Sequence, residues 1–199
     1  MTYNVLTLLG SVWLSVFVLM SIVWLIFLKI KQASIVDVFW SLAITLSACI
    51  WGCGAAHSWP VMTLKSLLII WAVRLAGYLF FTRILPGHTD RRYDQLSAHW
   101  SISKQLGFFL NFQLQGALAM IIACPFYWLD SFTGVGGFYV IAVIMITFGW
   151  IGECMSDYQL RQFQLSHPKQ VCQTGLWRYS RHPNCFFDWL IWLGFAVAV

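Results

Sequence analysis

Charge is scarce in this chain of 199 residues. Asp, Glu, Lys and Arg make up 10% of the sequence, whereas apolar residues make up 60%. This composition excludes an ordinary soluble domain, because a soluble core could not hide so much apolar surface. Long uncharged runs such as Val5 to Leu28 are instead typical of a multi-pass membrane protein that confines most of its charge to loops.

The sequence also lacks the cysteine and histidine motifs that are typical of metal sites and redox sites. No pair among the six cysteines has zinc-finger or redox spacing, and the five histidines contain no HxxxH or HxH pattern. Cys49 and Cys53 are one helical turn apart, but they lie in an apolar run, where cysteine usually acts as a small hydrophobic residue. We therefore expect neither a disulfide nor a metal site.

The apolar runs predict an all-α, polytopic membrane helical bundle that forms a single transmembrane domain over residues 1–199. About 20 apolar residues cross the hydrocarbon core of a bilayer, which places spans at about 5–28, 38–56, 66–82, 106–129, 135–152 and 186–199. We expect the fifth to continue as a polar helical turn through Gln164. The last run has only 14 residues, so we expect five full spans and a sixth that is incomplete at the C-terminus. The alternative is a short re-entrant or tilted terminal helix.

The basic residues predict the orientation of these spans. A cleaved signal peptide is not expected, because Lys29 and Lys31 follow the first apolar run instead of preceding it. Ten of the twelve basic residues fall on one side of the predicted spans, which the positive-inside rule assigns to the cytoplasm. They are Lys29, Lys31, Arg83, Arg91, Arg92, Lys104, Arg161, Lys169, Arg178 and Arg181. The N-terminus is therefore expected outside, and the loop 157–185 in the cytoplasm.

Polar residues inside the spans gather in their cytoplasmic halves. Such groups are costly in a bilayer and usually face a protein interior or a wet cavity, so we expect a cavity open to the cytoplasm. The set comprises Asp37, Asn111, Gln113, Gln115, Glu153 and Asp157, with Arg74 near mid-depth. Asn111 and Gln115 share a helical face. The alternative is a structural network in which Asp157 pairs with Arg161, and Glu153 or Asp37 neutralises Arg74.

A cationic decapeptide, Gly175 to Asn184, lies between the last two apolar regions. Arg178 and Arg181 offer forked donors for phosphate or carboxylate, and Trp177 and Tyr179 offer planar faces for a ring. Gly175 permits a tight turn. Pro183 is expected to end the loop, with Asn184 capping the span that follows. The pattern favours an anionic, ring-containing cofactor; the alternative is a polybasic patch for anionic lipid headgroups.

Residues 174–188, TGLWRYSRHPNCFFD, resemble the C-terminal signature of the steroid 5-alpha-reductase-like membrane superfamily. They are most similar to its uncharacterised bacterial branch, with the pattern GLWRYSRHPNYFGE. Upstream segments resemble the same branch, so the similarity extends from about Ile35 onwards. These segments are VDVFW from Val36, WAVRL from Trp71, NFQLQG from Asn111, and Glu153 through Asp157 to Phe163. A bacterial inner-membrane location is what this resemblance implies.

The resemblance implies one of two chemistries. Reductases of the superfamily use NADPH to reduce a carbon–carbon double bond, whereas isoprenylcysteine carboxyl methyltransferases use S-adenosylmethionine and share an RHPxYxG-like motif. The expected partners are an apolar lipid- or steroid-like substrate and membrane lipids, with no nucleic acid. Candidates for the acid that polarises the substrate are Glu153, Asp157 and Asp37. The expected cofactor-binding residues are Trp177, Arg178, Tyr179, Arg181, His182, Asn184 and Asp188, with the arginines on phosphates and Asn184 on the nicotinamide side.

The chain departs from the branch pattern directly after Asn184. Cys185, Phe186, Phe187 and Asp188 stand where the branch has Tyr, Phe, Gly and Glu. An aromatic hydroxyl is lost, a small residue becomes bulky and the acid is one methylene shorter. Relatives usually continue for about another span. A truncated, non-catalytic homologue is therefore a third alternative.

Overall fold

The computed structural model describes residues 4–54, 58–87, 90–131, 134–168 and 170–198. Every regular element within these ranges is a helix, which confirms the all-α prediction. The chain divides into two compact units, Met1–Phe132 and Thr133–Val199. The ends of the predicted spans at residues 56 and 199, and the basic residue Lys169, lie outside the described residues. The single transmembrane domain stays a prediction.

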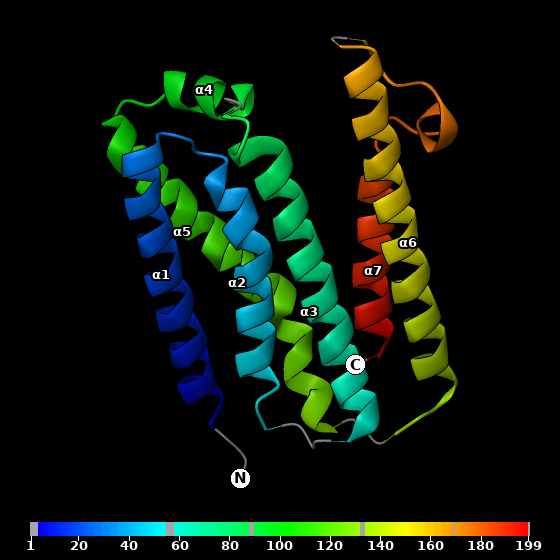
Figure 1. Ribbon diagram of the computed structural model, residues 1–199. Helices are drawn as coiled ribbons and strands as arrows, with labels where there is room; N and C mark the ends of the chain where they lie inside the picture. Colours follow the sequence, from blue (N-terminus) through cyan, green and yellow to red (C-terminus); the bar gives the residue numbers. More distant parts are fainter. Residues whose placement is uncertain (1–3, 55–57, 88–89, 132–133, 169, 199) are drawn as a thin grey trace. The chain divides into compact units, whose positions relative to one another are not determined.

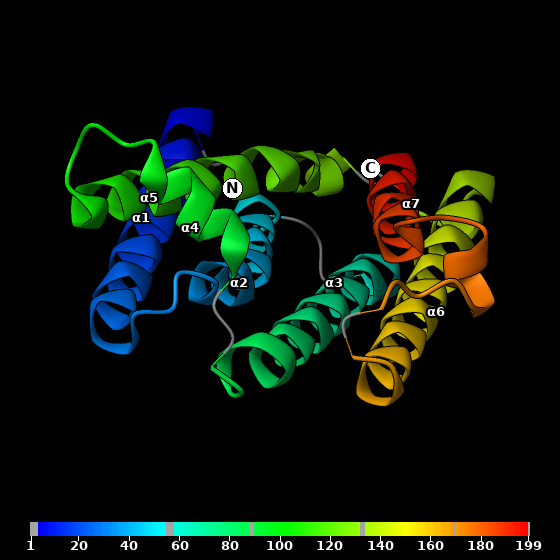
Figure 2. The ribbon, with the colours of Figure 1, turned by 90° about the horizontal axis from the view of Figure 1, so that it is seen from above.

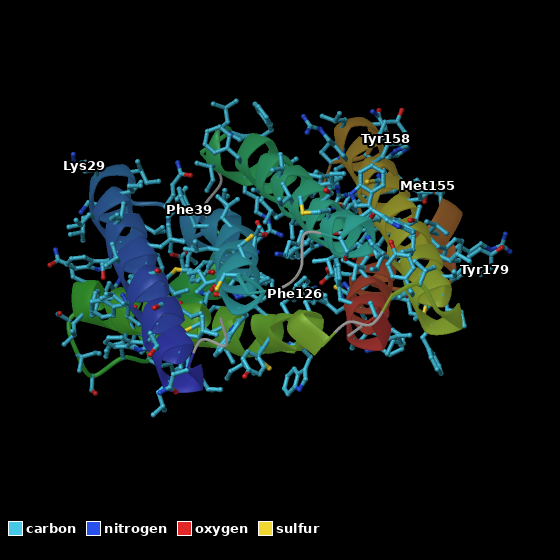
Figure 3. The ribbon with its side chains drawn as sticks, turned by 90° about the horizontal axis from the view of Figure 1, so that it is seen from below. Lys29, Phe39, Phe126, Met155, Tyr158 and Tyr179 are labelled. Carbon is cyan, nitrogen blue, oxygen red and sulfur yellow. The ribbon has the colours of Figure 1, made fainter. Side chains whose placement is uncertain are left out.

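The first unit is built on four long or medium helices. These are α1 (Val5–Ile30), α2 (Ile35–Trp51), α3 (Trp59–Leu79) and α5 (Lys104–Ala123). Helix α2 packs between α1 and α3, and α5 packs across α1 and α2 (Figures 1 and 2). The short α4 (Arg91–Ala98) lies at the end where α1 stops and α2 begins (Figure 1). That end also carries Lys29 (Figure 3).

Two helix ends in this unit change their winding. Helix α3 continues as a π-helical turn, Phe80–Ile84, and α5 continues as a 3-10 segment, Cys124–Ser131. Pro125 has no N–H to offer to the carbonyl four residues earlier, which accounts for the tighter winding that begins at Cys124. The predicted fourth span therefore ends in 3-10 form instead of as a continuous α-helix.

The second unit is a pair of helices with a loop. Helix α6 (Gly137–Ser166) and helix α7 (Pro183–Ala198) pack side by side and antiparallel (Figure 1). Helix α6 runs without a break from the apolar span into the polar segment, which confirms the predicted extension through Gln164. The loop between them contains the 3-10 helix η3 (Gly175–Arg178).

Small residues allow close packing of α6 against α7. A Cβ atom on Gly149 would lie 2.8 Å from the Ile191 side chain, and one on Gly194 would lie 2.7 Å from Ile146. At Gly152 an added Cβ would overlap the ring of Phe187. The bulky Phe187, which departs from the branch pattern, is accommodated in this chain by the glycine opposite it.

Four helical segments in the described part are long and apolar enough to cross a membrane: Val5–Ile30, Trp59–Ile84, Lys104–Leu129 and Gly137–Ser166. The other two expected spans, 38–56 and 186–199, overlap the shorter apolar helices α2 and α7, of 17 and 16 residues, and each helix begins three residues earlier than expected. Large apolar side chains such as Leu14, Ile121 and Ile144 are more than half exposed. Exposed apolar surface of this kind fits lipid contact.

Candidate functional site

The cationic decapeptide from Gly175 to Asn184, called the basic loop below, is fixed to α6 at two points. Gly175 has a φ of +58°, a left-handed conformation that favours glycine. The N–H of the next residue, Leu176, donates to Oε1 of Gln159 at 2.9 Å. The indole N–H of Trp177 donates to the carbonyl oxygen of Ser156 at 2.8 Å. The loop is therefore held against the polar half of α6, and half-buried Trp177 acts as an anchor as well as an aromatic surface.

An open groove of about 890 Å³ lies along this loop. Five of the seven predicted cofactor-binding residues line it: Trp177, Arg178, Tyr179, Arg181 and His182. Its other wall is formed by residues of α6 and by the segment 170–173. Asn184 and Asp188 lie on α7 and do not belong to the described lining of this groove. The structure thus brings together the loop residues of the prediction and leaves the two α7 residues apart from them.

The groove carries uncompensated positive charge. Arg178 and Arg181 are exposed and form no ion pair with any described residue. Tyr179 is 85% exposed and lies on the outer side of the loop (Figure 3). The N–H of His182 donates to the Ser180 hydroxyl at 3.2 Å, which shapes the turn before α7. Two free guanidinium groups beside aromatic rings are suited to a phosphate-bearing ring compound.

The predicted capping role of Asn184 is wrong. Helix α7 begins at Pro183, and the N–H of Phe186 donates to the carbonyl of His182 at 3.3 Å. Proline is favoured at the first helical position because its missing N–H would have no partner there. Asn184 therefore lies inside the first turn. Its Nδ2 donates to Oδ1 of Asp157 at 3.3 Å, which connects α7 to α6.

Two acidic candidates lie one turn apart on α6. Glu153 and Asp157 are each only 3% exposed. The alternative pairing of Asp157 with Arg161 is not formed: Arg161 is exposed and makes no ion pair within the described residues. Asp157 instead accepts the hydrogen bond from Asn184.

The third candidate acid, Asp37, lies in the first unit in a network that the sequence did not reveal. Its Oδ2 accepts from Arg83 at 2.9 Å and from Arg92 at 3.1 Å, and its Oδ1 accepts from the Tyr93 hydroxyl at 2.6 Å. Asp37 therefore pairs with Arg83 and Arg92, and the alternative in which Glu153 or Asp37 neutralises Arg74 stays a prediction. The one feature of the sequence that could have indicated this network is the dense run of charged residues from Asp90 to Asp94.

Charge around this network shifts three pKa values. The hydrogen bond from Arg92 lowers the pKa of Asp90, and the same bond raises the pKa of Arg92. Burial, together with the Asp37 carboxylate, raises the pKa of Tyr93. Tyr93 therefore stays a neutral hydroxyl that donates to Asp37.

The polar face of α5 adjoins this network. Gln115 Nε2 donates to Asn111 Oδ1 at 3.0 Å, which confirms that these residues share a face, and it also lies 3.4 Å from the Tyr93 hydroxyl. Gln113 Nε2 donates instead to Ser21 at 3.2 Å. Because Asp37 and this α5 face belong to the first unit and Glu153 and Asp157 to the second, their common cavity stays a prediction.

These features define an all-helical protein of membrane type. Its basic groove is lined by α6 and by the loop that connects α6 to α7. Its family follows from comparison with known proteins. The chain belongs to the family described as protein of unknown function DUF1295, which it matches over residues 23–199. No curated protein and no solved structure matches it.

Proposed function

We propose that this protein is an integral-membrane reductase that binds NADPH along the basic groove and reduces a double bond in an apolar, lipid- or steroid-like substrate. The observation that carries the proposal is the pair of exposed, unpaired guanidinium groups of Arg178 and Arg181 beside Trp177 and Tyr179. The resemblance of residues 174–188 to the steroid 5-alpha-reductase-like signature supports the same assignment.

The residues present fit such a cofactor. A volume of about 890 Å³ lies within the range of pockets that hold cofactor-sized ligands. Arg178 and Arg181 would hold the phosphates, and Trp177 or Tyr179 would stack on a ring. Oδ1 of Asn184 is buried and accepts no hydrogen bond from the described residues. Asn184 lies outside the groove lining, so the amide N–H of a nicotinamide would reach this acceptor where the cofactor extends beyond the groove towards α7; a buried acceptor without a donor is otherwise costly.

The cofactor would supply a hydride, and the chain would orient and polarise the reacting groups. Asp157 holds Asn184 through the 3.3 Å bond, which makes Asp157 a positioning residue. In its protonated form, Glu153, buried one turn farther from the loop along α6, would donate a hydrogen bond that polarises the substrate carbonyl. Asp37 is less suited to this role, because two arginines and Tyr93 already occupy its oxygens.

Ligand titration of the purified chain in detergent tests the proposal. We expect NADPH to raise the thermal midpoint saturably, and Arg181→Ala to weaken its binding about tenfold or more, since a hydrogen bond to a charged group is lost. Arg161→Ala is the matched control, because Arg161 is an exposed arginine of α6 outside the groove. A response to S-adenosylmethionine alone would favour the methyltransferase alternative. No saturable response to either ligand would favour a non-catalytic homologue.

A further inference from the structure

The first unit contains a second, smaller polar cavity. It has a volume of about 190 Å³ and lies where the end of α1, the start of α2, α4 and the start of α5 meet. Its polar lining includes Lys31, Ser34, Asp94 and Lys104, and Phe27 and Phe108 form an apolar wall. None of its lining residues belongs to the loop 175–184. This volume is below the range of pockets that bury drug-sized ligands, which suits a small headgroup and is too small for a dinucleotide.

Buried polar atoms at this cavity have no partner within the described part of the chain. Ser34 is 2% exposed, yet its hydroxyl makes no hydrogen bond there. It precedes α2 without capping it, and the first N–H groups of that helix are held by the main-chain carbonyls of residues 32–34. Oε1 of Gln32, which also lines the cavity, is buried and unpaired as well. Because buried polar groups nearly always have partners, the Ser34 hydroxyl points to a ligand.

The charges around the cavity define what that ligand carries. Lys31 and Lys104, from the end of α1 and the start of α5, form no ion pair with the described residues, and Asp94 forms none either. Asp90 also lines the cavity, but Arg92 contacts its carboxylate and Arg83 lies 3.9 Å away. Two exposed cations and one exposed anion among the lining residues are therefore without an ion-pair partner in the described part of the chain. Their complement is a group with one phosphate and one ammonium.

The surroundings favour a lipid as the source of this group. Ile30 on α1 and Leu96 on α4, each three residues from a lining residue and so on the same helix face, are 38% and 42% exposed. The indole N–H of Trp24 donates to the carbonyl of Gln105 at 3.0 Å, next to Lys104. Tryptophan and lysine at a helix end are typical of the membrane–water boundary. Acyl chains attached to a headgroup here would have apolar helix surface beside them.

We propose that this cavity binds the zwitterionic headgroup of a phospholipid of the phosphatidylethanolamine type. Lys31 and Lys104 hold the phosphate, the Ser34 hydroxyl donates to a phosphate oxygen, and the Asp94 carboxylate accepts from the ammonium. The site is independent of the proposed cofactor groove, because its residues all belong to the first unit.

Binding of short-chain lipids to the delipidated full chain tests this site. We expect dioctanoyl-phosphatidylethanolamine to stabilise the protein saturably and to bind at least about tenfold tighter than dioctanoylglycerol, which lacks the phosphate. Lys104→Gln should weaken this binding about tenfold. Lys29→Gln, which removes an exposed lysine of α1 outside the cavity, should not change it. NADPH titration should be unaffected by Lys104→Gln.

Two further variants separate binding from folding. Ser34→Ala should leave the ligand-free thermal midpoint unchanged or raise it, because it removes an unpaired buried hydroxyl, while it weakens lipid binding. Asp94→Asn should abolish the preference for phosphatidylethanolamine over phosphatidylglycerol. Equal binding of these two lipids by the wild type would overturn the ammonium site. Equal binding of free glycerophosphoethanolamine and the lipid, or binding that Lys104→Gln does not weaken, would overturn the assignment to a phospholipid.

Discussion

The indole of Trp177 and the main-chain carbonyl of Ser156 are joined by a 2.8 Å hydrogen bond. The residue before Trp177 makes a second bond, from its N–H to Gln159. Both acceptors lie within one turn of α6. The basic loop is thus seated on a helix, which holds Arg178 and Arg181 in a defined position beside the groove.

Loss of the indole donor should loosen this loop. Trp177→Phe keeps an aromatic ring but removes the bond to Ser156, which should lower stability by about 1 kcal/mol. It should also speed tryptic cleavage after Arg178 and Arg181, because local opening exposes the loop. Cleavage rates in detergent measure this. Trp189→Phe, at an exposed tryptophan of α7, is the control, and equal rates in both variants would contradict the anchoring role.

Helix packing in the second unit depends on Gly152. Gly152→Ala places a methyl group against the ring of Phe187, and overpacking of this kind costs roughly 1–3 kcal/mol. Combination with Phe187→Leu should cost less than the sum of the two single changes, since the residues are in contact. Thermal unfolding of the wild type, the two single variants and the double variant measures the coupling. Gly10→Ala, with no atom within 4 Å of the added Cβ, should not destabilise the protein, and additive effects at 152 and 187 would refute the contact.

Acid should remove the contribution of Asp90. Its pKa is lowered in the folded chain by the bond from Arg92, so its stabilisation is present above the ordinary aspartate pKa of about 3.9 and is lost as pH falls through the lower folded value. Asp90→Asn should therefore lower the thermal midpoint at pH 7, and the difference from wild type should shrink below about pH 4. Asparagine can still cap α4 at this position, so the change isolates the charge.

A matched substitution in the same helix gives the comparison. Asp94→Asn removes an acid that makes no ion pair with the described residues. It should lower the thermal midpoint of the delipidated protein at pH 7 less than Asp90→Asn does. A pH-independent difference between wild type and Asp90→Asn would show that the Arg92 bond does not act through charge.

Thiol labelling can test the expected orientation. In a background with the other cysteines replaced by alanine, native Cys53 should react with a membrane-impermeant maleimide on intact cells, because it is exposed beyond α2 and expected outside. Ser180→Cys, at an exposed loop position, should react only after permeabilisation. The reverse pattern would invert the topology and place the groove outside.

Periodicity and local chemistry predicted the presence of the helices well, but they predicted the residues at which the helices begin and end less accurately. The extension of α6 through Gln164 was predicted because its polar residues are good helix formers that continue an apolar span without a break; the helix ends two residues later, at Ser166. The start of the last span was expected three residues too late, at 186 instead of Pro183, since Pro183 is compatible with the first helical turn and was taken as the end of the loop. Asn184 consequently turned from an expected cap into a link to Asp157.

Contacts between distant residues could not be predicted from this sequence. The loop residues that line the groove were foreseen because they are adjacent in the chain and share a chemistry. The bond between Tyr93 and Asp37 joins residues 56 positions apart, and neither residue type nor spacing marks them as partners. The hydrogen bond of Trp177 could not be predicted either. Its ring suggested a stacking role, whereas its indole N–H donates to the carbonyl oxygen of Ser156 on another helix.

The contact of Phe187 with Gly152 also bears on how the family can diverge. The side chains at these two positions on neighbouring helices occupy the same space in the close-packed interface. A bulky residue at one position therefore requires a residue as small as glycine at the other. Relatives with glycine at the position of Phe187 are free to carry a larger side chain at the position of Gly152. Substitution at these two sites is therefore expected to be correlated, and a family-wide comparison of the pair would register the helix contact without any structure.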